Sequence, residues 1–561
     1  MSAELVIRGG TIVDGTGAPG VRADLAIANG RVAEIGQNLR GDRVLDAGGH
    51  VVAPGFVDIH THYDAQVFWD PALTPSCHHG VTTVVAGNCG FSIAPTRESH
   101  RELIARTLEN VEDMNVASLA EGIPWDFATF PEYLASVERH GTSLNFAAYI
   151  GHTALRLFGM GDDAYERAAT PEEIARMQAI LRDALRAGAA GFATSFAITH
   201  RGVDGKPVPS RFADRAEIEA LLQVLGEEQR GAFSIAPGEN CTFADLYELQ
   251  PRTRVPFTYG ALLTFPGGGH KQLVNLNEAG WARGAEVWPQ VTPRPLTFAM
   301  TLAEPFTLNT NPEFAALMGK PLAVRRAAYA DAGFRARALA GWQAQRVLVP
   351  RFDTFVVDES PAQPALVGRR LSELASERGA ALFDTLLDLA LGEPDLRMRI
   401  RATLANDETS EVGALLADPH CVLGLSDAGA HVGQLCDAPQ ATDFLGNWVR
   451  ERSLMSIEDA VRRLTSVQAD LIGLAGRGRL LPGSHADVVV FDPATVSPGP
   501  VRRVRDFPAN AERLTADAPT GVRHVLVNGV PVRAEGKHLT TGAKPGQVVR
   551  PVRRSEVRAA N

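Results

Sequence analysis

An almost entirely apolar stretch, Val51 to Ile59, lies near the start of the chain. Unbroken apolar runs of this length are typical of strands that are buried on both faces. Two histidines, His60 and His62, follow at its end and open a polar loop. Residues two apart along a strand share a face, so both imidazoles can point at one metal ion. The pattern therefore predicts a buried strand that ends in a metal site, against the alternative of two ordinary core or surface histidines.

Helical and strand patterns alternate through the middle of the chain. Residues 171–188 carry apolar side chains at helical spacing, begin with Pro-Glu-Glu and end on Gly, and residues 189–195 have the pattern of a following strand. Similar switches recur at 386–392 and 421–427. Such alternation predicts a parallel sheet with helices between its strands. Around 305–374 the alternation weakens, which indicates inserted segments.

Short β-type runs lie at both ends of the chain. Residues 5–15 and 24–36 are broken by Gly and Asn-Gly turns, a pattern typical of hairpins. A similar pattern returns at 486–493 and 522–532. Such runs on either side of a long α/β middle predict a small β-sandwich that both termini build. The Arg-rich residues after about 541 are predicted to be either loosely ordered or a packing arm.

Composition narrows the class of protein. The chain has 561 residues, more than one ordinary domain, and its 45% hydrophobic and 21% charged residues describe a soluble globular protein. No apolar run approaches the roughly 20 residues that cross a bilayer, and the N-terminus lacks a signal-peptide pattern, so we expect a cytoplasmic protein. A net charge of −10 without a basic cluster argues against nucleic acid as a partner. The five cysteines are widely spaced and predict no disulfide framework.

Two motifs carry a resemblance to a known family. Residues 54–62 read Pro-Gly-Phe-Val-Asp-Ile-His-Thr-His, and residues 79–90 read His-Gly-Val-Thr-Thr-Val-Val-Ala-Gly-Asn-Cys-Gly. The first motif resembles the amidohydrolase superfamily as a whole. The second resembles its D-aminoacylase (N-acyl-D-amino-acid deacylase) branch, and the resemblance extends over about residues 5–535.

The resemblance implies an α/β fold with two parts. One is a (β/α)8 TIM-like barrel with insertions, and the other is the small β-sandwich already indicated by the two termini. The predicted boundaries are 1–57 and 479–545 for the sandwich, 58–478 for the barrel and 546–561 for a C-terminal tail.

The resemblance also implies a set of metal ligands beyond the two histidines. Asp427, just after the apolar run 422–425, matches the last-strand aspartate that acts as metal ligand and proton shuttle, whereas the alternative role is a helix N-cap. Cys89 matches the position at which the branch uses a cysteine as ligand, and the alternative is a buried inert thiol.

The sequence departs from the branch where further histidine ligands are expected. The fifth strand is predicted at 231–240, which contains no histidine. The sixth is predicted at 255–263, and His270 follows only after a Gly-rich loop, so its ligation stays open. His60, His62 and Asp427, with Cys89 nearby, suffice for one zinc ion with an open position for water. We therefore predict one tightly bound Zn²⁺.

Three further residues are candidates for substrate binding. His152, in a Gly-His-x-x-Leu-Arg element of the family, binds either substrate or water, or makes a structural hydrogen bond. Arg294 follows an apparent strand end, where a guanidinium can hold a carboxylate, and a salt bridge is the alternative. His431 lies four residues past Asp427 and is predicted to orient a substrate carbonyl or the aspartate.

These residues predict a metal-dependent hydrolase of a small-molecule amide. The preference for a linear N-acyl-D-amino acid comes from the resemblance alone. A hydrolase of cyclic amides or imides is the alternative within enzymes, because the same chemistry opens such rings. A silent binding homologue without metal is the alternative outside enzymes. We predict neither a nucleic-acid nor a membrane partner, and association into a homo-oligomer stays open.

Overall fold

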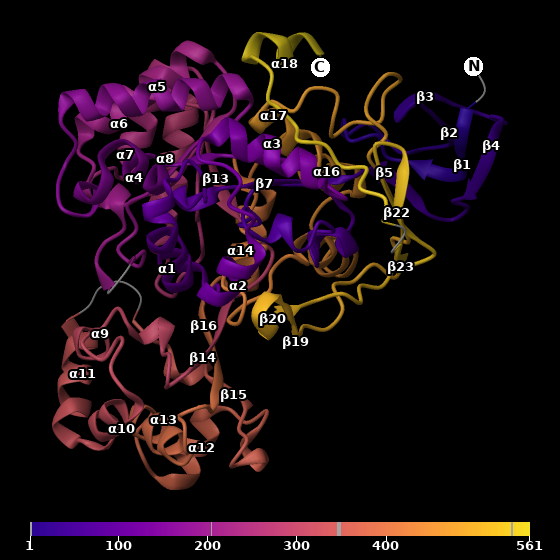
Figure 1. Ribbon diagram of the computed structural model, residues 1–561. Coiled ribbons are helices and arrows are strands. Elements are labelled where there is room, and N and C mark those ends of the chain that lie inside the picture. Colours follow the sequence, from indigo (N-terminus) through magenta and orange to yellow (C-terminus); the bar gives the residue numbers. More distant parts are fainter. Residues whose placement is uncertain (1–2, 203–204, 345–348, 540–541, 561) are drawn as a thin grey trace.

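A closed barrel of parallel strands lies at the centre of the molecule (Figure 1). The computed structural model describes residues 3–202, 205–344, 349–539 and 542–560. The barrel closes where Thr61, after the first strand, bridges to Ala428, after the last. The predicted barrel is thereby confirmed. Its strands are β6 (Phe56–Asp58), β7 (Val81–Ala86), β8 (Asn145–Ala148) continued by β9 (Ile150–Gly151), β10 (Gly191–Ser195), β11 (Ala232–Ala236), β12 (Phe257–Tyr259), β13 (Val287–Val291) and β17 (Val422–Leu423).

The outer helices begin and end at residues that the sequence marks. In α5 (Pro171–Ala187), Thr170 and Glu173 form a capping box, and Gly188 ends the helix with a φ of 110°. β10 follows directly, as the alternating pattern predicts. The other long helices around the barrel are α1 (Arg101–Glu112), α3 (Phe130–His140), α4 (His152–Met160), α6 (Arg215–Glu228), α7 (Phe243–Thr253), α8 (His270–Ala282), α14 (Thr409–Ala417), α16 (Ile457–Leu464) and α17 (Ser466–Ile472).

The two termini build one nine-stranded sheet beside the barrel. β18 from the C-terminal part pairs antiparallel with β5 from the N-terminal part, so the sandwich forms only when both ends of the chain meet. Its core includes Leu25, Val488 and Leu526, which are fully buried. The strands are β1 (Ala3–Ile12), β2 (Val21–Ala28), β3 (Arg31–Gly36), β4 (Gly41–Asp46), β5 (Val51–Pro54), β18 (Val488–Phe491), β21 (Val522–Val527), β22 (Val530–Ala534) and β23 (Lys537–His538).

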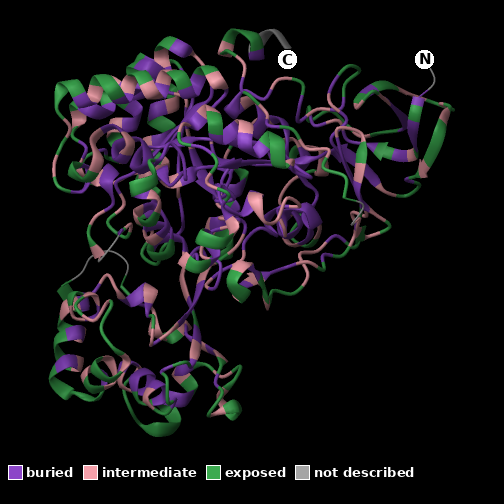
Figure 2. Ribbon diagram, viewed as in Figure 1, coloured by how far each residue is buried: buried purple, intermediate pink, exposed green. Residues whose placement is uncertain are grey.

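An inserted lobe separates the last two barrel strands, β13 and β17 (Figure 1). It has a core of its own, in which Phe314, Tyr329 and Trp342 are buried, while its outer faces are exposed (Figure 2). Its antiparallel sheet has the order β14-β16-β15, which the weak sequence pattern did not indicate. The lobe contains β14 (Leu296–Thr301), β15 (Val356–Glu359), β16 (Arg399–Ala405), α9 (Pro312–Ala315), α10 (Leu322–Ala330), α11 (Ala332–Ala344), α12 (Leu371–Arg378) and α13 (Leu382–Leu391).

The C-terminal segment runs along the barrel and ends in α18 (Arg554–Ala560). Backbone hydrogen bonds join Phe146 to Gln547 at 2.9 Å and Val552 to Gly473 at 3.1 Å. These contacts make the segment a packing arm. None of the helices in the described ranges is both long and apolar enough to cross a bilayer.

Candidate metal centre

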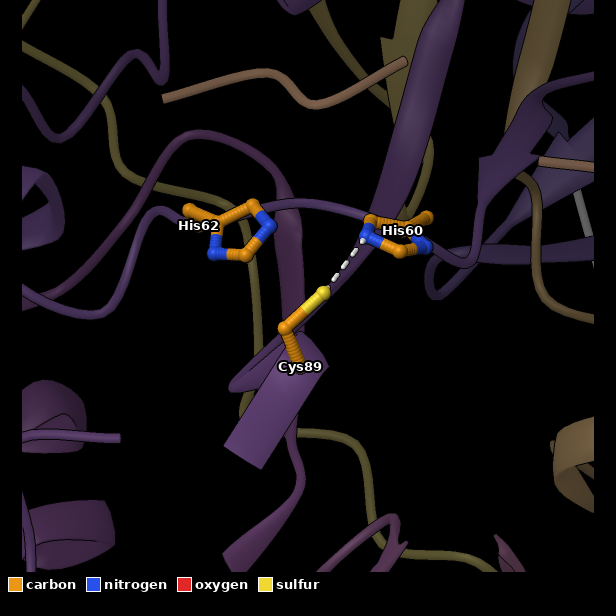
Figure 3. Close-up of side chains that lie close together, drawn as sticks. All are labelled: His60, His62 and Cys89. Atoms are coloured by element: carbon orange, nitrogen blue, oxygen red, sulfur yellow. Dashed lines mark hydrogen bonds between the residues drawn. The ribbon is translucent and has the colours of Figure 1, made fainter. Parts of the chain in front are cut away.

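The two histidines after β6 lie at the carboxyl end of the barrel, almost completely buried. His60 is 2% exposed and His62 is 3% exposed. Nε2 of His60 lies 3.6 Å from Sγ of Cys89, which follows the next strand, β7 (Figure 3). One ligand atom from each of these three residues lies within 4.8 Å of the other two. The structure therefore gathers the two histidines and the cysteine into one cluster.

The loop after β7 positions Cys89 through close backbone contacts. A Cβ at Gly87 would lie 2.4 Å from the Tyr149 carbonyl oxygen, and one at Gly90 would lie 2.9 Å from Cα of Thr194. Both glycines also have positive φ, so no other residue fits this turn without strain. Between them, the Asn88 amide donates to carbonyl oxygens at the ends of β6 and β7. These interactions explain why the Gly-Asn-Cys-Gly sequence presents the thiol to the histidines.

Asp427 completes the cluster from beyond the last barrel strand. Its Oδ1 lies 3.1 Å from Nε2 of His60 and 3.9 Å from Nε2 of His62. The Ser426 hydroxyl donates to the His60 carbonyl oxygen at 2.9 Å, which ties the loop after β17 to the end of β6. Asp427 has a φ of 43° and Cys89 a φ of 54°, both in the left-handed region that non-glycine residues rarely adopt. Such strained residues gather at functional sites, where the surrounding structure holds them.

Two outer residues contact the imidazoles. Oε1 of Gln290 lies 2.5 Å from Nδ1 of His60, and the Gln290 amide nitrogen donates to Thr258, so its oxygen faces the ring. Oε1 of Glu112, at the end of α1, lies 3.2 Å from Nδ1 of His62. With the proton on Nδ1 in each ring, both Nε2 lone pairs face the centre. Neither residue was predicted from the sequence. The polar Gln290 inside an otherwise apolar strand could have indicated a functional position, whereas Glu112 lies in no motif.

The chemistry of these groups fits a divalent metal ion. Burial, followed by the nearby His60 and His431, holds the pKa of His62 well below its usual range, so its imidazole is neutral as a ligand must be. Burial, with the neighbouring carboxylates, raises the pKa of the Cys89 thiol and of the Glu112 carboxyl. A bound cation reverses such shifts. Two imidazole nitrogens, a thiol and a carboxylate form a donor set that suits zinc.

The opposite half of the barrel mouth lacks comparable groups. β11 ends at Ala236, before Pro237 and Gly238, and β12 ends at Tyr259, before Gly260. A Cβ at Gly260 would lie only 3.3 Å from Cε1 of His60, so this position faces the cluster without a side chain. The structure does not bring His270 there: its Nε2 lies 3.4 Å from Oε2 of Glu411. Within the described ranges, no second group of ligands completes the mouth.

Two further histidines lie beside the cluster. His200 follows β10, and its Nδ1 lies 2.6 Å from the Ser195 hydroxyl. Burial and the nearby His431 lower the pKa of His200 to about 3, so it stays neutral. Nδ1 of His431 is buried and has no hydrogen-bond partner in the part of the chain that the structure describes. Phe298 and Phe306 of the inserted lobe pack on the His431 ring, with centroids 5.1 and 5.5 Å away.

Comparison with known proteins places this site in a family. A sequence model of the amidohydrolase family matches residues 43–533. This chain belongs to the amidohydrolase family. The resemblance predicted from the two sequence motifs is thereby confirmed.

Similar proteins cover almost the whole amidohydrolase chain. N-acyl-D-glutamate deacylase of Alcaligenes xylosoxydans xylosoxydans is 31% identical over 98% of this chain and 96% of its own length. The structure of N-acyl-D-glutamate deacylase from Bordetella bronchiseptica, complexed with zinc and a phosphonate mimic of the tetrahedral intermediate, is 29% identical with a TM-score of 0.67, over 98% of this chain and 100% of that one. A D-aminoacylase structure, 26% identical with the same TM-score and coverage, is described as having a binuclear metal centre with one-metal activation and second-metal attenuation.

The remaining two candidates of this amidohydrolase lie outside the cluster. His152 is fully buried, its Nδ1 lies 2.8 Å from the Thr194 hydroxyl, and its Nε2 lies 2.8 Å from Glu217, which also pairs with Arg156. These contacts match the structural alternative for His152. Nε of Arg294 donates to Asp437 at 2.6 Å, so the guanidinium already has a carboxylate partner.

A cavity of about 690 Å³ lies between the inserted lobe and the loop after β17. Arg294 and Asp437 line it, together with Arg399 and Arg401 of β16. The four ligand-type residues of the cluster do not line it; these are His60, His62, Cys89 and Asp427. The cavity therefore does not include the cluster, but it gives Arg294 access to a small molecule.

Proposed function

We propose that this amidohydrolase uses zinc to cleave the linear amide of an N-acyl-D-amino acid, giving a carboxylate and a D-amino acid. The observation that carries the proposal is the convergence of His60, His62, Cys89 and Asp427 in a chain of this family. Relatives of about 30% identity over nearly full length carry deacylase names, which supports the substrate class.

The four ligand-type residues would bind the metal ion, and Asp427 would also transfer a proton. His60, His62 and Asp427 would hold the ion, with Cys89 as an additional ligand. A zinc ion at this site supplies a Lewis acid that lowers the pKa of water and polarises a carbonyl. Asp427 accepts the proton of the attacking water as the new C–O bond forms. It then gives that proton to the amine nitrogen as the C–N bond breaks, so the reaction balances without another reactant.

His431 and Arg294 are the residues proposed to bind and orient the substrate. His431 offers a buried nitrogen without a protein partner in the described ranges, which is suited to donate to the substrate carbonyl oxygen. Burial lowers the pKa of His431, so it donates as a neutral ring. Arg294 would anchor the substrate carboxylate because it lines the cavity of about 690 Å³. Its guanidinium would then pair with both the substrate and Asp437.

A single catalytic zinc is the second part of the proposal. It is supported by the ends of β11 and β12, where Ala236, Pro237 and Gly260 cannot ligate through side chains. The description of one-metal activation in a similar D-aminoacylase is consistent with a single working ion.

A panel of N-acyl D- and L-amino acids, D-dipeptides and hydantoins, assayed with added zinc, tests the proposed activity. We expect turnover of N-acyl-D-amino acids and little or none of their L-enantiomers. Turnover confined to hydantoins would replace the proposal by a cyclic amide hydrolase. No turnover in a metal-poor protein would indicate a silent homologue. The cytoplasmic location stays a prediction, which fractionation of the source cells would test.

A further inference from the structure

A second cluster of metal-ligand side chains lies away from the barrel mouth, where the sandwich meets the barrel. Cys77 and His78 belong to the short helix η2 (Ser76–His79), which leads into barrel strand β7, and His538 belongs to the sandwich strand β23. One ligand atom from each residue lies within 4.8 Å of the other two. The cluster therefore joins two parts of the fold that are more than 400 residues apart in sequence, as the 461-residue separation of Cys77 and His538 shows.

The geometry of this cluster is close to that of a zinc site. Sγ of Cys77 lies 4.0 Å from Nδ1 of His538, and the rings of His78 and His538 have centroids 5.4 Å apart. In a tetrahedral zinc site with Zn–S of about 2.3 Å and Zn–N of about 2.0 Å, sulfur and nitrogen lie about 3.5 Å apart. For the Cys77–His538 pair, movement of a few tenths of an ångström in each side chain would close the difference, and the ligand atoms of all three residues lie within 4.8 Å of one another.

Burial favours a metal over an accidental contact. Cys77 is fully buried and His78 is 8% exposed, whereas His538 is only half-buried and keeps a path to solvent. A thiol and two imidazoles are the donors that borderline and soft metals prefer. Three such donors leave the fourth position of a tetrahedral zinc ion open. Water can reach that position because His538 is only half-buried.

Arg533 is a neighbour of this cluster that competes with a cation. Its Nη1 lies 3.4 Å from Nδ1 of His78, a long contact that a metal would replace. Its Nε still donates to the Val522 carbonyl oxygen at 3.1 Å, so the guanidinium keeps a partner. Burial raises the pKa of the Cys77 thiol, and the nearby charge of Arg533 opposes only part of that rise, so a metal would have to displace the thiol proton.

We propose that Cys77, His78 and His538 form a second, non-catalytic zinc site that fastens β23 of the sandwich to the barrel. Strand β23 has only two residues, Lys537 and His538, and pairs with one neighbour, β22. A bound ion would hold this edge strand against η2 and so stabilise the junction of the two domains. This site is independent of the proposed hydrolysis, because none of its three residues belongs to the barrel-mouth cluster.

Cobalt titration of the full-length, metal-free protein tests the site, because each cluster contains one cysteine. Co²⁺ bound to a thiolate gives a charge-transfer band that reports each site separately. We expect two equivalents of Co²⁺ in the wild type, with the band halved in Cys77→Ser and absent when Cys89→Ser is added. Cys241→Ser, a buried cysteine outside both clusters, is the matched control and should leave the titration unchanged.

Zinc counting and activity complete the test. Zinc-loaded Cys77→Ser should hold one ion fewer than the wild type and retain hydrolase activity within about twofold. His538→Gln changes a half-buried edge residue and provides the same count if Cys77→Ser does not fold. Equal counts of zinc in the wild type and both variants would overturn the proposal. So would a wild-type cobalt titration that ends at one equivalent and disappears in Cys89→Ser.

Discussion

The two halves of the barrel mouth differ in the side chains they present. The strands β6, β7 and β17 end in His60, His62, Cys89 and Asp427, whose polar atoms converge. Strand β11 ends at Ala236 and Gly260 directly follows β12, and neither residue presents a ligand atom in its side chain. Both halves consist of parallel strands of the same barrel, so the contrast lies in the residues at the strand ends.

This contrast separates what the fold supplies from what the residues supply. The parallel barrel brings the ends of all its strands to one face. The outer contacts also lie in the ligand-rich half, where Gln290 hydrogen-bonds to His60 and Glu112 contacts His62. Under the proposal of a single zinc ion, the ligands of one half suffice for a mononuclear site. The predictions below test each part of the ligand-rich half, beginning with the largest expected effect.

Asp427→Asn should lower kcat by about 10² to 10⁴, because the amide keeps the size of the carboxylate but accepts no proton. Steady-state kinetics with an N-acyl-D-amino acid measures the loss, and thermal unfolding confirms that the fold is intact. Asp418→Asn, just before the same strand β17, is the matched control and should keep activity within about twofold. Activity of Asp427→Asn within about tenfold of the wild type would exclude the aspartate as proton shuttle.

Cys89→Ser should remove most of the pH dependence of zinc affinity. Burial raises the pKa of the Cys89 thiol, so zinc binding near pH 7 must release its proton, whereas His62, whose pKa is lowered, is already neutral. Wild-type affinity should therefore rise with pH, by about tenfold per unit and about 100-fold between pH 6 and 8. Calorimetry in buffers of different ionisation enthalpy counts the protons at the barrel site, with Cys77→Ser as background. An unchanged proton count in Cys89→Ser would mean that the thiol does not ligate.

Glu112→Gln should weaken zinc binding by about 10- to 100-fold, as the loss of an outer carboxylate usually does. The amide keeps the shape of the side chain but no longer stabilises the Nδ1–H tautomer of His62 with a charge. Competition with a chromophoric chelator measures the affinity. Glu109→Gln, one turn earlier on α1, is the control and should bind zinc as the wild type does. Equal affinities in the two variants would show that Glu112 has no role in orienting His62.

Arg294→Met should raise KM for a carboxylate-bearing substrate by about tenfold while changing KM for the corresponding primary amide by less than about twofold. The expected effect is the smallest because Asp437 already occupies part of the guanidinium. Michaelis kinetics with both substrates gives the comparison. Equal changes in the two KM values would mean that Arg294 serves only the ion pair with Asp437.

Sequence reasoning identified the ligand-rich half because each of its residues follows an apolar strand in a local motif. His60 and His62 follow the apolar run 51–59, which the structure divides into β5 of the sandwich and β6 of the barrel, and Asp427 follows 422–425. It did not identify Glu112 because that residue reaches the site from the end of a helix, through a contact that only the tertiary fold creates. The cluster of Cys77, His78 and His538 was hidden for the same reason, since its members lie at opposite ends of the chain.

The antiparallel sheet of the inserted lobe also escaped prediction. β15 and β16 lie about 40 residues apart in sequence and are separated by two helices, so no hairpin signal joins them. For Arg294, the sequence predicts its position after a strand but not its ion pair. The partner, Asp437, lies in a loop 143 residues away in the sequence.

Anomalous diffraction at the zinc edge, recorded on crystals of the zinc-loaded wild-type protein, tests the single catalytic ion most directly. We expect one peak at the barrel mouth, among His60, His62, Cys89 and Asp427. A separate peak at Cys77, His78 and His538 would belong to the second, non-catalytic site and does not bear on the number of catalytic ions. The half with Ala236 and Gly260 should be empty of peaks. Two fully occupied peaks about 3.5 Å apart at the mouth would contradict the mononuclear centre, because a ligand from the opposite half would then have to hold the second ion.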